Sequence, residues 1–280
     1  MVRASLNLHL LFLFLLFPLI SVHAALRIVS LKPNITDVLM RIEAGGNLVG
    51  ATTFCTLPPA LAAVPRVSDY VRANLEAVVA AAPTLIITSK ENSEQKEINR
   101  LRELGFRVEL VSFQSLDGIY AAILQIGNWV GKTPEAQALV GNLKTRLAAL
   151  AARAAALPSQ PRLLWMVGQR PMVAVGGKTI FGDFFAALHL DNPLASSVLP
   201  YPQLSKEQLF ALDPDWIFDI SEAESNPRLV RLYADHFTAL RAVREHHVHV
   251  LSAADFLPGP PLWDGLEQVI GILEAGWKKL

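Results

Sequence analysis

The chain has 280 residues, 52% of them hydrophobic, and equal numbers of basic and acidic side chains, 25 of each. A chain of this length can form one large domain or two smaller ones, each with its own core. The zero net charge gives no basic footprint for nucleic acid, and the high apolar content excludes a disordered chain.

The first 24 residues have the pattern of a secretory signal peptide. Arg3 precedes the short apolar run Leu10–Ile20. Residues 22–24 then provide the small residues of a signal-peptidase cleavage site after Ala24. The run is short for a membrane span, so a retained anchor is the less favoured alternative. We therefore predict a soluble protein of a bacterial periplasm. Cys55 is the only cysteine and cannot form a disulfide within the chain.

Short apolar runs alternate with helical patterns in the first part of the exported chain. Leu26–Leu31 forms the first predicted strand. Asn74 is a cap residue that opens a short helix, and Pro83 stops that helix. The apolar run Leu85–Ile87 follows as a buried strand.

A helix at Gln95–Leu104, closed by Gly105, leads to a strand at Arg107–Val111. The segment Pro134–Leu157 is rich in Ala and Leu and predicts one helix of roughly 35 Å at 1.5 Å per residue. A turn at 158–161, which begins and ends with proline, stops it. An ordinary crossover helix within one sheet is the alternative interpretation.

The second half repeats the pattern of the first. Arg162–Val167 is a predicted strand, Ser205 opens a short helix, Pro214 stops it, and the apolar strand Trp216–Phe218 follows. Two more predicted elements complete this half, a helix at Phe237–Arg244 and a strand at His247–Leu251.

This repetition predicts an α/β protein of two related lobes with parallel sheets, joined by one long helix. The expected boundaries are 25–130 for the N-terminal lobe, 131–158 for the connecting helix and 159–280 for the C-terminal lobe.

Several segments carry a specific resemblance. They are Arg27–Asp37, Leu48–Thr52, Val67–Tyr70, Tyr201–Gln208 and Phe256–Pro260. Together they resemble the substrate-binding proteins of importers for cobalamin, haem and ferric siderophores, and Tyr-Pro-Gln-Leu-Ser-Lys-Glu-Gln at 201–208 is similar to a segment of the cobalamin-binding members. The resemblance implies a helical-backbone periplasmic binding protein, monomeric, with its ligand between the lobes. The chain departs from the family pattern at Lys32, Asp37 and Pro261.

Glu76 and Glu207 stand two residues after the two helix caps. The resemblance implies that each lobe presents one of these glutamates to arginines of a membrane permease, which works with its ATPase subunits. A carboxylate at a helix start stays ionised and can pair with a guanidinium. The alternative is that each glutamate only stabilises its own helix.

Loops at strand ends supply the candidate ligand-binding residues, because open α/β sheets bind ligands there. Tyr70 and Tyr201 each offer a flat face for a macrocycle, with packing against proline as the alternative role. The other candidates follow predicted strands and are Lys32, Pro33, Asn34, Gln169, Arg170, Asp255 and Phe256. Trp165 and Trp216 lie within strand runs and are assigned to the core.

His246, His247 and His249 form the only histidine cluster, and no second His or Cys group complements them, so we predict no metal site. Motifs of common enzyme classes are absent. We therefore predict a binding protein with cobalamin or a related corrinoid as ligand and no resident cofactor. Haem and a ferric siderophore are the alternatives within the class, and a periplasmic enzyme on a chelatase-like scaffold is the alternative outside it.

Overall fold

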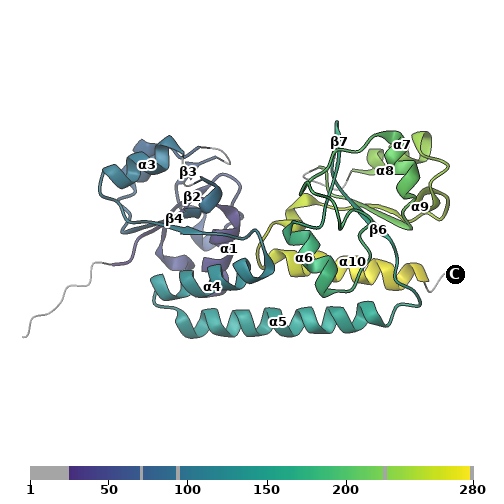
Figure 1. Cartoon of the computed structure of the whole chain (residues 1–280). Helices are drawn as coiled ribbons and strands as arrows, with labels where there is room; N and C mark the ends of the chain where they lie inside the picture. The colour runs from purple at the N-terminus through teal and green to yellow at the C-terminus, as the bar shows by residue number, and fades with distance from the viewer. Residues whose placement is uncertain (1–24, 70–71, 93–94, 223–225, 278–280) are drawn as a thin grey trace, which may run out of the picture.

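The computed structural model describes residues 25–69, 72–92, 95–222 and 226–277. The predicted signal peptide, residues 1–24, and the candidate ligand residue Tyr70 lie outside the described residues. Within the described part, two α/β lobes stand side by side over one long helix (Figure 1). The predicted fold class is confirmed.

The N-terminal lobe contains a five-stranded sheet in the order β3-β2-β1-β4-β5, with every neighbouring pair parallel. Its strands are β1 Ile28–Ser30, β2 Leu48–Thr52, β3 Arg66–Ser68, β4 Leu85–Ser89 and β5 Val108–Val111. Its helices are α1 Pro33–Arg41, α2 Leu75–Ala80, α3 Lys96–Glu103 and α4 Leu116–Trp129, with short 3-10 turns at Gly45–Asn47, Pro59–Leu61 and Lys90–Asn92.

The C-terminal lobe contains a four-stranded sheet in the order β7-β6-β8-β9. Its strands are β6 Leu163–Gln169, β7 Met172–Ala174, β8 Trp216–Asp219 and β9 Val248–Val250. Its helices are α6 Ile180–Ala187, α7 Lys206–Leu212, α8 Pro227–His236, α9 Arg241–Arg244 and α10 Pro261–Trp277, with a 3-10 turn at Ala253–Phe256. The expectation of purely parallel sheets fails at β7, which runs antiparallel to β6, because the chain turns straight back at Arg170 and Pro171 instead of crossing over.

The long helix α5, Thr133–Ala155, runs beneath both lobes (Figure 1). It has Pro134 in its first turn, where proline is tolerated because that amide has no partner within the helix. The predicted helix at Pro134–Leu157 therefore matches the observed one to within two residues at each end.

The sequence repeat reappears as a structural repeat. The side chains of Asn74 and Ser205 accept hydrogen bonds from backbone amides of α2 and α7, as predicted for helix caps. Each helix is followed by a residue with positive φ, Ala82 at 44° and Asp213 at 36°, directly before the stopping proline. Both short helices thus end by the same turn, and each delivers the chain into a buried strand of its sheet.

The predicted helix at Phe237–Arg244 is wrong for the first half of its length. Helix α8 ends at His236, and only the four residues of α9 are helical within the predicted range. Asn226 caps α8 by accepting from the amide of Arg228, and proline follows at the first helical position. Sequence reasoning missed this start, in which an N-cap residue is followed by proline, and therefore predicts the helix too late in the chain.

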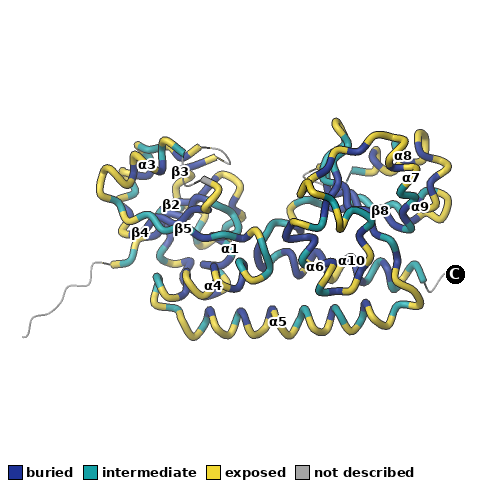
Figure 2. Tube along the Cα trace, viewed as in Figure 1, coloured by how far each residue is buried: buried dark blue, intermediate teal, exposed yellow. Residues whose placement is uncertain are grey.

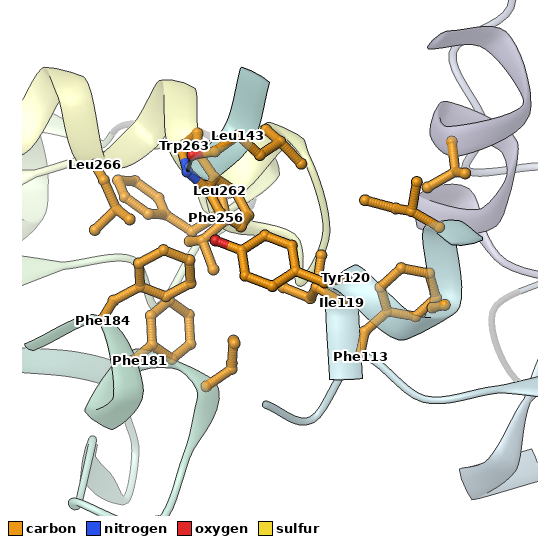
Figure 3. Close-up of a cluster of buried hydrophobic side chains, with 14 of the residues drawn as sticks. Phe113, Ile119, Tyr120, Leu143, Phe181, Phe184, Phe256, Leu262, Trp263 and Leu266 are labelled. Carbon is orange, nitrogen blue, oxygen red and sulfur yellow. Dashed lines mark hydrogen bonds between the residues drawn. The ribbon is translucent and has the colours of Figure 1, made fainter. Parts of the chain in front are cut away.

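One hydrophobic core continues from the first lobe into the second (Figures 2 and 3). Trp263 of α10 lies at its centre, fully buried, and packs edge-on against Phe184 at 4.9 Å between ring centroids. Tyr120 of α4 approaches the same indole from the first lobe at 6.0 Å. The Trp263 Nε1–H donates to the carbonyl oxygen of Leu143 in α5 at 2.8 Å, so α10 is tied to the long helix by a buried bond.

Replacing Trp263 by Phe should lower the free energy of unfolding more than the same change at Trp165. Both indoles are buried, and in the described structure only the Trp263 Nε1–H has a hydrogen-bond partner. Trp263→Phe removes the hydrogen bond to the Leu143 carbonyl, which contributes about 0.5–1.5 kcal/mol beyond the lost packing. Urea unfolding of the two variants measures the difference, and equal losses would contradict it.

Candidate ligand-binding cleft

The parallel strands of the first lobe end at one edge of its sheet, and the segments that follow β1, β4 and β5 line a pocket there. The C-terminal lobe closes the pocket with the segment between β9 and α10. Its volume is about 290 Å³. The lining residues are Lys32, Pro33, Asn34, Ser89, Glu91, Phe113, Gln114, Leu257 and Pro258. We call this space the floor pocket.

Three predicted residues, Lys32, Pro33 and Asn34, come together in the floor pocket. Asn34 also joins the lobes, because its Nδ2 donates to the carbonyl oxygen of Pro258 at 2.8 Å. Its Oδ1 accepts from the amide of Ile35 at 3.0 Å. The amide nitrogen thus holds the junction, and the amide oxygen bonds locally at the start of α1.

Lys32 and Glu91 are the charged residues of the floor pocket. Partial burial of Lys32 lowers the pKa of its ammonium, and the nearby Glu91 carboxylate opposes that shift. Glu91 accepts a hydrogen bond from the Ser112 hydroxyl at 3.4 Å. Sequence reasoning missed Glu91, because it lies in a polar loop two residues after β4 and nothing in that loop distinguishes it from its neighbours.

The second lobe carries exposed apolar side chains next to β7. Segment 202–204 pairs with the free edge of β7, through bonds from Ala174 N to Pro202 O and from Leu204 N to Met172 O. The residues just before it are exposed hydrophobic side chains: Val198 at 81%, Leu199 at 59% and Tyr201 at 45% of their surface. Tyr201, a predicted ligand residue, therefore belongs to a larger apolar patch that the sequence alone did not reveal.

The first lobe has a corresponding exposed aromatic residue in Phe54, which is 59% exposed. It follows β2 by two residues, and the amide of the preceding Thr53 donates to Ser68 at the end of β3. Phe54 therefore lies at the strand-end edge, next to the segment that leads to Tyr70. Sequence reasoning missed Phe54, although an aromatic residue two positions after a strand is a candidate for the strand-end edge.

A family model described as "Periplasmic binding protein" matches residues 28–254. The chain belongs to the periplasmic binding protein family. It is 28% identical over 256 residues to a vitamin B12-binding protein of Vibrio cholerae, covering 90% of this chain and 91% of that protein. The crystal structure of the periplasmic vitamin B12 binding protein of Vibrio cholerae is similar with a TM-score of 0.75 and 26% identity, covering 90% and 98% of the two chains.

A periplasmic haem binding protein from Pseudomonas aeruginosa is also similar, with a TM-score of 0.76 and 25% identity over 90% of this chain and 92% of that one. These relatives are thus proteins that bind vitamin B12 or haem, and periplasmic location is typical of the family. Among the helices that the structure describes, none is long and apolar enough to cross a membrane.

Three further predicted ligand residues do not line the floor pocket. The Gln169 Nε2 contacts the buried carboxylate of Asp219 and donates to the Tyr233 hydroxyl at 2.7 Å, so this amide is engaged with the layer around α8. Arg170 and Asp255 are exposed at the ends of β6 and of the short turn after β9.

The prediction for Phe256 is corrected by its burial. Its ring is 2% exposed and packs edge-on against Trp165 at 5.0 Å, so it presents no surface to a ligand. The core assignments of Trp165 and Trp216 are confirmed, at 2% and 1% exposure.

Glu76 and Glu207 are both exposed in the first turns of α2 and α7. Hydrogen bonds from its own backbone amide and from the Ser205 hydroxyl lower the pKa of Glu207. Its carboxylate is therefore available to a cationic partner throughout the neutral range.

Two of the three clustered histidines, His247 and His249, pack against aromatic side chains of the core. The imidazole of His247 stacks on Trp216 at 3.7 Å, and His249 stacks on Phe218 at 5.6 Å. Among the described residues no group of three or more His, Cys, Asp or Glu is placed to hold a metal ion. Burial, and secondly the nearby His247, lowers the pKa of His249.

This shift predicts weaker folding in acid. Because the pKa of His249 is lower in the folded state, the unfolded chain binds the proton first, and stability falls as the pH drops below about 6.5. His249→Phe keeps a ring against Phe218 and removes the titration. Urea unfolding between pH 7.5 and 5.5 should show a shallower loss for the variant, and parallel curves would refute this role.

Proposed function

We propose that the chain is the periplasmic substrate-binding component of an ABC importer and that it captures cobalamin or a related corrinoid between its lobes. The observation that carries the proposal is the pair of exposed apolar surfaces, Phe54 on one lobe and Val198, Leu199 and Tyr201 on the other. A corrin ring is broad and largely apolar with amides at its rim, so it needs flat contact area from both sides. The vitamin B12-binding relatives support the same ligand.

Haem is the second candidate, favoured by the similarity to the Pseudomonas aeruginosa protein. Ferric haem requires an axial ligand such as a tyrosinate or a histidine. Burial raises the pKa of Tyr201, which disfavours the tyrosinate form. The described part of the cleft therefore supports the corrinoid better, with Tyr70 still a predicted ligand residue.

Tyr201→Ala should weaken cyanocobalamin binding by about 1–3 kcal/mol, the scale of a well-packed aromatic anchor. Tyr201→Phe should have little effect, because the ring that contacts the corrin remains. Phe210→Ala removes an exposed aromatic from α7 as a control and should leave affinity unchanged. Isothermal titration calorimetry measures all three. Heat with haemin and none with cyanocobalamin would overturn the ligand assignment.

We propose further that Glu76 and Glu207 dock the loaded protein on its membrane permease. The double variant Glu76→Ala, Glu207→Ala should keep its affinity for cyanocobalamin and lose uptake into cells. If charge attraction guides docking, the difference in uptake between wild type and the variant should narrow as salt rises, because salt screens the attraction that only the wild type has. Asp117→Ala with Asp235→Ala removes one exposed carboxylate per lobe as a control. Wild-type uptake of labelled cyanocobalamin by the glutamate variant would rule out this role.

A further inference from the structure

The floor pocket places a cation and an anion on the same small space. Lys32 precedes the first turn of α1, and Glu91 lies in the short turn after β4. Both line the pocket, and the Glu91 carboxylate acts to raise the pKa of Lys32. The pocket therefore carries a donor-only ammonium and an acceptor-only carboxylate in one cavity.

Lys32 and Glu91 are the charged residues that line the floor pocket, and the other lining residues are uncharged. Both ends of the Asn34 amide already make hydrogen bonds, to the Pro258 carbonyl and to the Ile35 amide. Phe113, Leu257 and two prolines make the rest of the wall largely apolar. Apolar walls strengthen the interaction of a charged group with whatever polar group enters. The chemistry of the ligand group that fits is therefore set by Lys32 and Glu91 together.

A primary carboxamide satisfies both charges at once. Its oxygen accepts a hydrogen bond from an ammonium, and its NH₂ group donates to a carboxylate. A carboxylate arm would attract Lys32 but face the Glu91 oxygens, acceptor against acceptor. An apolar arm would offer a hydrogen bond to neither charge in a partly dehydrated space. The volume, about 290 Å³, holds a side arm and not a macrocycle.

We propose that the floor pocket is a specificity subsite that binds one carboxamide arm at the ligand's edge, with the amide oxygen on Lys32 and the amide nitrogen on Glu91. This inference rests on the proposed function and sharpens it. The flat walls of the cleft accept any planar macrocycle, whereas the floor pocket selects a ring edged with amides over one edged with carboxylates.

The test compares cyanocobalamin with its three monocarboxylic acids, in which one propionamide is hydrolysed. Binding to the purified protein is measured by calorimetry. At least one acid should bind about tenfold more weakly than cyanocobalamin, the scale of one hydrogen bond to a charged group. Glu91→Gln should return that acid to within about threefold of cyanocobalamin, because a glutamine amide can donate to the new carboxylate.

Lys32 is tested by two variants. Lys32→Met should weaken cyanocobalamin binding about tenfold, and Lys32→Gln, which keeps a donor without the charge, should lose less. Lys90→Met removes a neighbouring exposed lysine outside the pocket and should have no effect.

The outcomes separate this inference from the function on which it rests. Wild-type protein that binds cyanocobalamin and all three acids equally, with no effect of Glu91→Gln, would overturn the subsite and leave the corrinoid assignment intact. Wild-type protein that binds no cyanocobalamin would remove both. Rescue of a single acid by Glu91→Gln would support the subsite even if the Lys32 variants fail to fold.

Discussion

The buried contact of Trp263 with both lobes is the constraint on which the cleft depends. Its indole packs between Phe184 and Tyr120, and its nitrogen bonds to Leu143 in the long helix. A hinge between two separate cores could open widely, because little packing would be lost. Here the core is continuous, so large separation of the lobes would expose apolar surface. The strand-end edges are therefore held at a nearly set spacing.

A charged layer outside this core reinforces the same junction. Arg146 of α5 pairs with Asp264 at 2.6 Å and Glu267 at 3.1 Å, and Arg153 makes two bonds to Glu274 at 2.9 Å. These partly exposed pairs are individually weak, although a bidentate pair and a shared network do better than isolated ones. They align α10 along α5 and so orient the segment that carries Leu257 and Pro258 into the floor pocket.

The two lobes repeat one architecture and yet supply unlike walls. The first brings Lys32 and Glu91 to the pocket, and the second brings the apolar patch of Val198, Leu199 and Tyr201. The difference arises at β7, where an antiparallel turn and segment 202–204 extend the sheet. In the binding mode that we propose, flat apolar contact comes mainly from that extension, and polar selection comes from the loops of the all-parallel sheet.

The sequence by itself determined the elements that obey local rules. Asn74, Ser205 and their following prolines mark two helices, and the Ala-rich run predicts α5, because caps, prolines and periodicity act within a few residues of chain. Only the tertiary structure decided which strand-end residues meet. It joined Lys32 to Glu91, withdrew Phe256 into the core, and exposed Phe54. These outcomes depend on packing between segments distant in the chain, which no local pattern encodes.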